Sequence, residues 1–492
     1  MSSLVIAGDT SGTVTLQAPA VAGSTTVTLP ASSMNLGQGG GSVGTNTAFG
    51  ASALNANTTG AYNTAIGYQS MYSNTIGTTS TAIGYQSLYF QTNSYDNTAI
   101  GMEALKLTTT GDSNTAVGRR ALYANTTGVA SVAVGAYAAA ASTTSSGITA
   151  IGYGALTVST GSNNTAVGVQ TLYANTTGIQ NVAVGSYALV ANTVGQGNVA
   201  IGSSALQANT TGNNNTAIGT NSLYQNTTGI YNTAVGTAAS QNNTIGSGNT
   251  ALGYYALFAN TADNNTSVGY QSLASNSTGT PNDAFGYQAL YNNNTGYNNA
   301  AIGYQSMYST TSTYYNAALG YQSLYRISSG IRNTGIGYKA GYQITTGSYN
   351  TAIGSQAMGD GGNLATGSDN CAFGSWHDGV VEGPLAGLTS GSRNLAFGNG
   401  AMRSLTTGAD NVSIGYFSGA YSNALTTGSS NTLIGNYAST TSAGASNQIV
   451  IGASNVGQGD NYVSIGKGGT NYIYNQFTVN ATWTKASDER IK

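Results

Sequence analysis

A ten-residue segment, Asn63–Tyr72 (Asn-Thr-Ala-Ile-Gly-Tyr-Gln-Ser-Met-Tyr), recurs with small changes through most of the 492-residue chain. The glycine of its Asn-Thr-Ala-Ile-Gly core returns every 17 residues, and only the steps from 152 to 168 and from 253 to 269 are 16 residues between Gly50 and Gly354. A fixed period of this length is typical of a solenoid, in which each repeat forms one coil. The sequence therefore predicts an all-β protein, a parallel β-solenoid or β-roll of about 25 coils with 17-residue repeats. Its structural glycines include Gly67, Gly84, Gly101, Gly118, Gly219 and Gly303.

The composition suits an ordered β structure rather than a disordered chain. Only 5% of the residues are charged and 70 are glycine, but 40% are hydrophobic and 34 are tyrosine. Disordered chains are poor in apolar and aromatic residues. The formal net charge of −2 provides no basic surface for a polyanion. We therefore expect no nucleic-acid partner.

The sequence predicts no membrane insertion, because no apolar run approaches the roughly 20 residues that cross a bilayer. Residues Met1–Asp9 lack the basic and apolar regions of a secretory signal, so we expect no signal peptide. The single cysteine, Cys371, rules out an intrachain disulfide framework and a Cys-rich metal site. The sequence predicts neither a cofactor nor a bound metal.

Each repeat has an internal pattern relative to its core glycine. The residue two before the glycine is nearly always Ala, the residue one before is a large apolar residue, and the residue four after is mostly Leu or Met, as at Leu54 and Met71. Side chains alternate between the two faces of a strand. We therefore expect the large residue to fill the coil interior and the Ala to face outward at a subunit contact. We place the Leu or Met on a second short strand, also pointing inward.

A second glycine often follows ten residues after the first, usually behind Asn-Thr-Thr, as in Asn57–Gly60. Asn and Gly tolerate positive φ, so we predict that this segment is the turn that closes the coil. Asn57, Asn125 and Asn175 also match the N-glycosylation acceptor sequence. Without a secretory signal, turn chemistry is the better explanation for them.

The repeat divides the chain into four predicted segments. Residues 1–44 lack the repeat and alternate apolar and polar residues in short runs, which predicts a small β cap or attachment segment. Residues 45–354 are the regular solenoid. Residues 355–466 keep the core motif at irregular spacing, which predicts coils with loops. Residues 467–492 form a C-terminal tail.

The reiterated Asn-x-Ala-Ile-Gly core, over about residues 45–466, resembles the head repeats of trimeric autotransporter adhesins. This resemblance implies that each repeat is one coil of a left-handed parallel β-roll. It also implies that three chains pack about an axis as an elongated homotrimeric fibre. The repeats here are longer than in that family, so the outer turn must be larger.

The last residues, Ala486–Lys492, resemble the opening of the endosialidase-type intramolecular chaperone found on phage tail fibres and tailspikes. In that family the chaperone cuts itself off at a Ser-Asp bond after trimerisation, which implies processing between Ser487 and Asp488. The chaperone body is absent from this sequence, either removed or left out. The N-terminal segment Gly8–Leu16 is similar to openings of phage virion proteins.

The longest loop of the irregular coils carries the candidate binding residues Trp376, His377 and Asp378. A catalytic or metal cluster is one interpretation of them, and a decorated surface loop is the simpler one. Acidic residues such as Asp96 and Asp112 are scattered, whereas glycan hydrolases need paired carboxylates. We therefore expect no catalytic residues and no enzymatic activity.

Tyrosine recurs one and five residues after the core glycine, as at Tyr68 and Tyr72. Stacked coils would align these rings in columns, which either pack against neighbouring coils and subunits or bind sugars. The threonine three residues before the glycine forms a rank similar to those of ice-binding solenoids. Val132 and Val182 interrupt this rank, so ice binding is disfavoured.

These observations favour a structural and adhesive virion tail fibre, outside the cell, matured by a C-terminal intramolecular chaperone. Its expected partners are two further copies of itself, other virion or tail proteins bound through the N-terminal segment, and a glycan or protein receptor on the host surface. The alternative is a cell-surface trimeric adhesin or structural filament of non-viral origin. A glycan-degrading fibre is a third interpretation.

Overall fold

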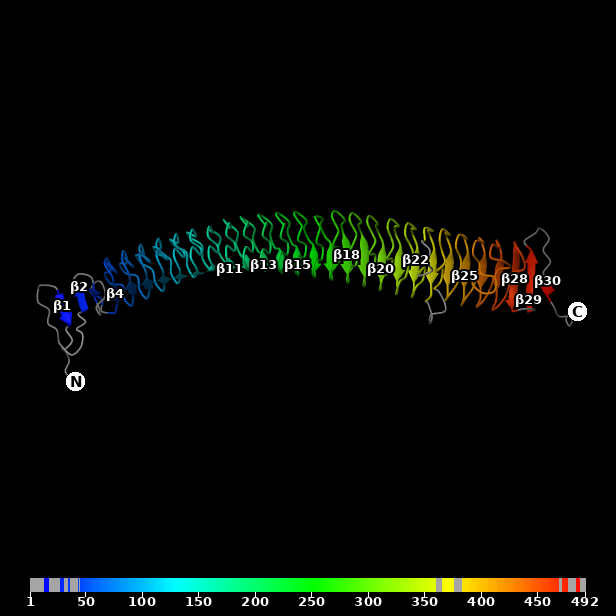
Figure 1. Cartoon of the computed structure of the whole chain (residues 1–492), viewed down its shortest axis with the longest axis horizontal. Helices are drawn as coiled ribbons and strands as arrows, with labels where there is room; N and C mark the ends of the chain where they lie inside the picture. Colours follow the sequence, from blue (N-terminus) through cyan, green and yellow to red (C-terminus); the bar gives the residue numbers. More distant parts are fainter. Residues whose placement is uncertain are drawn as a thin grey trace, which may run out of the picture. The chain divides into compact units, whose positions relative to one another are not determined.

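The computed structural model describes residues 13–16, 27–30, 34–35, 43, 45–359, 365–375, 383–468, 471–476 and 484–486. The chain divides into two compact units, Met1–Ile230 and Tyr231–Lys492, and each is considered separately. Every regular element in the described ranges is a β-strand. Figure 1 shows that each strand of the repeats occupies one side of its coil and that turns form the other side.

The first unit starts with an antiparallel pair, β1 (Thr13–Leu16) and β2 (Val27–Pro30). Next, β3 (Met34–Asn35) pairs antiparallel with β4, the first strand of the repeats. Eleven strands then stack in parallel, and each residue pairs with its equivalent in the next repeat, as Ala65 does with Ala82. They are β4 (Thr47–Phe49), β5 (Thr64–Ile66), β6 (Thr81–Ile83), β7 (Thr98–Ile100), β8 (Thr115–Val117), β9 (Val132–Val134), β10 (Thr149–Ile151), β11 (Thr165–Val167), β12 (Val182–Val184), β13 (Val199–Ile201) and β14 (Thr216–Ile218).

The second unit continues the same pattern with fourteen stacked parallel strands. They are β15 (Thr233–Val235), β16 (Thr250–Leu252), β17 (Thr266–Val268), β18 (Asn282–Phe285), β19 (Asn299–Ile302), β20 (Ala317–Leu319), β21 (Thr334–Ile336), β22 (Thr351–Ile353), β23 (Cys371–Phe373), β24 (Leu395–Phe397), β25 (Val412–Ile414), β26 (Thr432–Ile434), β27 (Ile449–Ile451) and β28 (Tyr462–Lys467). The register is kept where the spacing becomes irregular, since Ala352 of β22 pairs with Ala372 of β23. After β28 the chain turns back in antiparallel strands β29 (Asn471–Gln476) and β30 (Thr484–Ala486).

The predicted fold is confirmed: the protein is an all-β parallel solenoid with repeats of 17 residues in most coils. Successive coils are joined by backbone hydrogen bonds on both the strand side and the turn side. Thr64 N donates to Ser80 O at 2.9 Å, and Ala56 N donates to Tyr72 O at 3.1 Å. Each coil therefore satisfies its polar backbone through its neighbours.

The orientation predicted for the strand side chains is wrong. The Ala two residues before the core glycine is buried, with Ala65 and Ala82 both at 0% exposure, whereas Ile83 and Ile100 are 36% and 38% exposed. The Ala column therefore lies inside the coil and the large apolar column lies outside. The Ala side chain is not available for a subunit contact.

The reason lies in the volume that one coil encloses. The interior is filled from the turn side by the Leu or Met four residues after the glycine, and Leu54, Met71 and Leu88 are all fully buried. Where Gly335 replaces the Ala, an added Cβ would lie 2.9 Å from Cγ of Leu324. Opposite such a leucine, only a small residue fits on the strand.

The late coils show the same relation between the volume of the inward strand residue and that of the inward turn residue. Leu433 and Val450 occupy the Ala position of β26 and β27 and are fully buried. In the coil of Leu433, the inward position of the turn carries Ser439 instead of a leucine. A larger residue enters the strand column where the opposite residue is smaller, which keeps the interior close-packed.

The predicted second strand is also wrong, although its inward position is confirmed. Residues after the core glycine form a turn with left-handed backbone at alternate positions, as at Gln69 (φ 53°) and Met71 (φ 48°). This backbone lets the chain reverse within a few residues while it still sends Met71 into the interior.

The two glycines of a repeat have different roles. The core glycine Gly67 has φ 131°, a conformation open to glycine alone, and a Cβ there would lie 2.5 Å from the carbonyl oxygen of Gly84. The turn glycine Gly195 is not in the positive-φ region, contrary to our prediction. A Cβ on Gly195 would instead meet Gly212 O at 2.5 Å, so close approach of neighbouring turns requires this glycine.

Two buried asparagine ladders hold the turns to the strands. In one, Asn198 N donates to Asn181 Oδ1 at 3.0 Å, and Asn181 Nδ2 donates to Gly195 O at 2.9 Å. In the other, Asn192 Nδ2 donates to Asn175 Oδ1 at 2.7 Å and to Gly195 O at 3.0 Å. Each amide satisfies backbone groups that would otherwise be buried without partners.

These ladders also explain the apparent glycosylation sequences. Asn57 and Asn175 belong to the second ladder, and Asn125 Nδ2 donates to Gly128 O at 3.1 Å within its own turn. The three residues are 6%, 0% and 0% exposed. A glycan cannot be attached to such a side chain in the folded coil. These asparagines therefore have a structural role in the turn, but through buried amide hydrogen bonds and not through the positive φ that we predict for the turn.

Candidate functional site

The outer face of the stacked strands forms an apolar surface in each unit. Successive strands present first a residue that is most often threonine and then a large apolar residue to the outside. Asp283 is the one charged residue in the strands from β4 to β27. Exposed members of the apolar column are Phe49, Ile83, Ile100, Val134, Ile151, Ile201 and Ile218 in the first unit, and Leu252, Phe285, Ile302, Leu319, Ile336, Phe397, Ile414 and Ile434 in the second.

Sequence reasoning misses this outer sheet face because it places the large apolar residues in the coil interior. A signal was present in the sequence. From β4 to β25 the strand column two residues before the glycine contains only Ala, Ser or Gly, as at Ser267 and Gly335. A strict size limit is typical of a confined interior, whereas an outer column tolerates Val, Ile, Leu and Phe alike.

The second unit carries a strip of stacked tyrosines. Neighbouring ring centroids of its longer ladder are 5.0 to 5.4 Å apart, and those of its shorter ladder are 5.1 to 5.3 Å apart. Gln side chains run through the same coils as an amide ladder, in which Gln305 Nε2 donates to Gln288 Oε1 at 3.0 Å. The longer ladder is Tyr254, Tyr270, Tyr287, Tyr304, Tyr321 and Tyr338; the shorter is Tyr291, Tyr308, Tyr325 and Tyr342.

This stacking decides between the two interpretations of the tyrosine columns. Rings such as Tyr287, Tyr304 and Tyr321 lie within 6° of parallel, so each covers the faces of its neighbours. A sugar needs an open aromatic face to stack on, and these rings present mainly edges and hydroxyls. The same packing buries part of the shorter ladder, and burial raises the pKa of Tyr325. The ladders are packing elements.

Charged side chains form a small cluster in the first unit. Glu103, whose side chain is 9% exposed, contacts Lys106 Nζ at 2.7 Å and Arg120 Nε at 2.6 Å. The hydrogen bond from Lys106 is the largest cause that lowers the pKa of Glu103, and Arg120 adds to it. Lys106 and Arg120 also lie over the ring of Tyr123. The carboxylate is fully occupied by these cations and is no candidate for acid–base chemistry.

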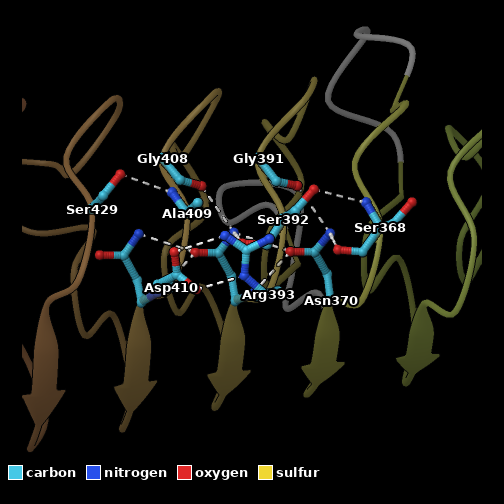
Figure 2. Close-up of polar contacts among 11 residues, drawn as sticks. Ser368, Asn370, Gly391, Ser392, Arg393, Gly408, Ala409, Asp410 and Ser429 are labelled. Carbon is cyan, nitrogen blue, oxygen red and sulfur yellow. Dashed lines mark hydrogen bonds and ion pairs between the residues drawn. The ribbon is translucent and has the colours of Figure 1, made fainter.

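The surface of the later coils is shown in Figure 2, where polar contacts run from coil to coil. Arg393 and Asp410 form an exposed bidentate pair at 2.7 and 2.9 Å. Beside it, Ser368 N donates to Ser392 Oγ at 3.0 Å, and Ala409 N donates to Ser429 Oγ at 3.0 Å. These contacts link turns of neighbouring coils and gather no catalytic group.

The predicted site residues have different outcomes. Trp376, His377 and Asp378 and the processing pair Ser487 and Asp488 lie outside the described residues. All six structural glycines keep positive φ, as Gly219 (φ 130°) and Gly303 (φ 133°) illustrate. Gly67, Gly84, Gly101 and Gly118 have φ between 131° and 137°.

Within the described ranges, His, Cys, Asp and Glu side chains nowhere gather in a group of three that could hold a metal ion. In that same part of the chain, no helix is long and apolar enough to span a membrane. Cys371 is a free thiol on β23.

Comparison with known proteins returned no match: no protein-family model, no curated protein and no solved structure is similar to this chain. The function is therefore argued from the geometry of the coils.

Proposed function

We propose that this chain is one subunit of an elongated homotrimeric virion tail fibre that attaches to a host-cell surface and acts by binding rather than catalysis. The single observation that carries the proposal is the apolar outer sheet face of each unit. A β-solenoid of about 24 turns suits a fibre-like structural protein. A continuous exposed apolar surface of this size marks a place where another protein packs.

The size of the face fits a subunit interface. A three-residue strand is about 10 Å wide, and fourteen strands at about 4.8 Å spacing extend about 65 Å, so the face of the second unit covers about 650 Å². Standard interfaces bury about 800 Å² on each partner. The face of the second unit alone therefore approaches the area of a standard interface, and the first unit carries a face of the same pattern.

The pattern of the face suits three parallel chains about one axis. Subunits related by a three-fold axis meet through different surfaces, so one column of a subunit contacts the other column of the next. The outer face offers two unlike columns, a threonine column (as Thr81 and Thr98) and an apolar column (as Ile83 and Ile100). This face, rather than the buried Ala column, is the subunit contact that we propose.

The virion and host parts of the proposal rest on the resemblances in the sequence. The repeats resemble adhesin heads, and Ala486–Lys492 resemble the start of a fibre chaperone that would act at Ser487 and Asp488. The partners are accordingly other virion or tail proteins, bound through the N-terminal segment, and a host glycan or protein receptor.

The subunit contact is tested by replacing Ile83, Ile100 and Val134 together with lysine. These side chains are 36–38% exposed on the outer sheet face. We expect wild-type protein to scatter light as three chains of 49.4 kDa and the triple variant to fall to monomers, because charge would be buried at the contact.

The matched control places three lysines at Ile76, Val129 and Val194, which are 39–48% exposed on turns. This control should remain trimeric. A monomeric wild type, or a trimer that survives the sheet-face lysines, would contradict the proposal. Attachment is tested separately by measuring labelled trimer retained on candidate host cells, and retention on none of them would count against that part.

A further inference from the structure

The coil from Gly253 to Gly269 is one residue shorter than its neighbours. The preceding turn reads Asn243-Thr-Ile245-Gly and the following turn reads Asn276-Ser-Thr278-Gly, whereas the short coil reads Asn260-Thr-Ala-Asp263. The residue after Thr261 is missing, at the place of Ile245 and Thr278 in the adjacent coils. All three turns belong to the second unit.

A hollow opens where this residue is missing. It has a volume of about 430 Å³, within the range of small-ligand sites. Ile245 and Thr278, from the coils on either side, form two of its walls. Ile245 is 62% exposed, so its side chain is open to a ligand. The hollow is lined by Ile245, Ser247, Thr261, Asp263, Thr278 and Thr280.

The deletion does not loosen the turn. Thr261 donates to Ser277 O from its backbone N at 3.0 Å and from its Oγ1 at 2.9 Å. Asn260 Nδ2 donates to Ala262 O at 2.7 Å, in place of the usual turn glycine carbonyl. Asn264 N donates to Ser247 O at 2.9 Å. The ladders therefore hold the hollow open, and a ligand does not have to order it.

The chemistry of the hollow combines an acceptor, hydroxyls and an apolar wall. Asp263 Oδ1 accepts a hydrogen bond from Ser247 N at 2.7 Å, which fixes the carboxylate. An ionised carboxylate has further lone pairs with which to accept hydroxyl protons. Thr280 Oγ1 contacts Asp263 O, and Thr278 adds a second hydroxyl to the rim.

We propose that this notch binds a single sugar residue, such as the terminal residue of a glycan. The carboxylate would accept from neighbouring sugar hydroxyls, threonine hydroxyls would exchange hydrogen bonds with the ring substituents, and Ile245 would cover the apolar face of the sugar. The notch lies on turns, whereas the proposed subunit contact lies on strands, so it stays open in the fibre. The role of the notch in attachment rests on the proposed function, whereas its ability to bind a sugar does not.

The test uses the whole purified protein and saturation-transfer NMR with the methyl glycosides of glucose, galactose, mannose and N-acetylglucosamine at millimolar concentrations. We expect transfer to at least one glycoside. A variant with one threonine inserted after Thr261 restores the 17-residue coil, fills the notch and should abolish transfer. Asp263→Asn should weaken binding about tenfold, since a hydrogen bond to a charged group is lost.

The matched control is Asp112→Asn. Asp112 accepts from Tyr95 N at 2.9 Å in a coil of normal length, so its loss should leave transfer unchanged. No transfer from the wild type, or transfer unaffected by the insertion, would overturn the proposal. If circular dichroism shows that the insertion variant does not fold, the test is whether Asp263→Asn and Ile245→Ala reduce transfer. Unchanged transfer in both variants would then overturn the proposal. Light scattering of the same samples tests the trimer independently, so the two proposals can fail separately.

Discussion

At the scale of single residues, the coil imposes strict size limits. The strand column two residues before each core glycine faces a leucine or methionine from the turn, so Ala65 and Ala82 are fully buried while Ile83 lies outside. A side chain of greater volume enters this column only where the opposite residue shrinks, as at Leu433. Hydrophobicity alone would place the large apolar residue inside and the Ala outside. The packing volume of the coil interior requires the opposite arrangement.

Replacement of a core glycine tests this limit on the backbone. Gly303 has φ 133°, and a Cβ there would clash with the carbonyl of Gly320 in the next coil. We expect Gly303→Ala to destabilise the coil by about 3 kcal/mol, measured as a fall in the urea midpoint or in amide protection of the neighbouring coils. Gly444→Ala is the control, because the nearest atom is Thr427 Oγ1 at 3.5 Å. An equal effect of both substitutions would contradict this explanation.

At the scale of the coil, the coils before and after it supply most of the hydrogen-bond partners of its polar groups. The asparagine ladders, the tyrosine ladders and the Gln ladder all join a residue to its equivalent one repeat away. Within a single 17-residue coil the hydrogen bonds are short-range turn contacts, such as that from Asn192 Nδ2 to Gly195 O, so most of its stability comes from the stack. The Glu103 cluster is the charged version of the same ladder, since other coils carry Gln69 and Gln86 at its position.

The Glu103 cluster predicts a local pH dependence. Hydrogen bonds from Lys106 and Arg120 lower the pKa of Glu103 below its ordinary value of 4.5. A carboxyl whose pKa is lowered on folding contributes stability that is present above the unfolded value and is lost as the pH falls through the folded value. We expect amide protection around residues 101–123, corrected for intrinsic exchange, to fall below pH 4.5.

The control for that measurement is Glu103→Gln, which copies the neutral residue of neighbouring coils and should remove the acid dependence. The coil that carries Gln305 provides an internal reference within the same sample. Protection that falls equally in Glu103→Gln and wild type would show that another group titrates.

At the scale of the whole molecule, the low charge and the apolar sheet face of each unit bear on the association that we propose. With 5% charged residues and Asp283 alone among the charged residues of strands β4 to β27, the proposed contact has almost no ion pairs to screen. Association of this kind depends on apolar burial, which salt does not weaken. The proposed contact lies on strands and the proposed notch lies on turns, so we expect assembly and sugar binding not to compete.

Salt therefore discriminates between an apolar and an ionic contact. We expect the molar mass from light scattering to remain that of three chains when NaCl is raised from about 0.1 M to about 1 M, where the Debye length falls from about 10 Å to about 3 Å. The triple lysine variant of the sheet face should stay monomeric throughout. Dissociation of the wild type at high salt would point to a charged interface elsewhere on the chain.

The sequence by itself determined the period, the all-β solenoid, the strand before each core glycine and the inward Leu or Met column. These follow from local repetition, because equivalent residues of stacked coils must align. The size limit of the Ala column hinted in the sequence at which strand face is inside, but the tertiary structure decided it, because the limit is explained only by the leucine and methionine side chains that fill the interior opposite Ala65. The tertiary structure also decided that Asn57 belongs to a buried ladder, that the rings of Tyr287 and Tyr304 cover each other, and that one missing residue beside Thr261 opens a notch. The ladder, the ring stacking and the notch all depend on the distance between neighbouring coils, which the sequence does not specify.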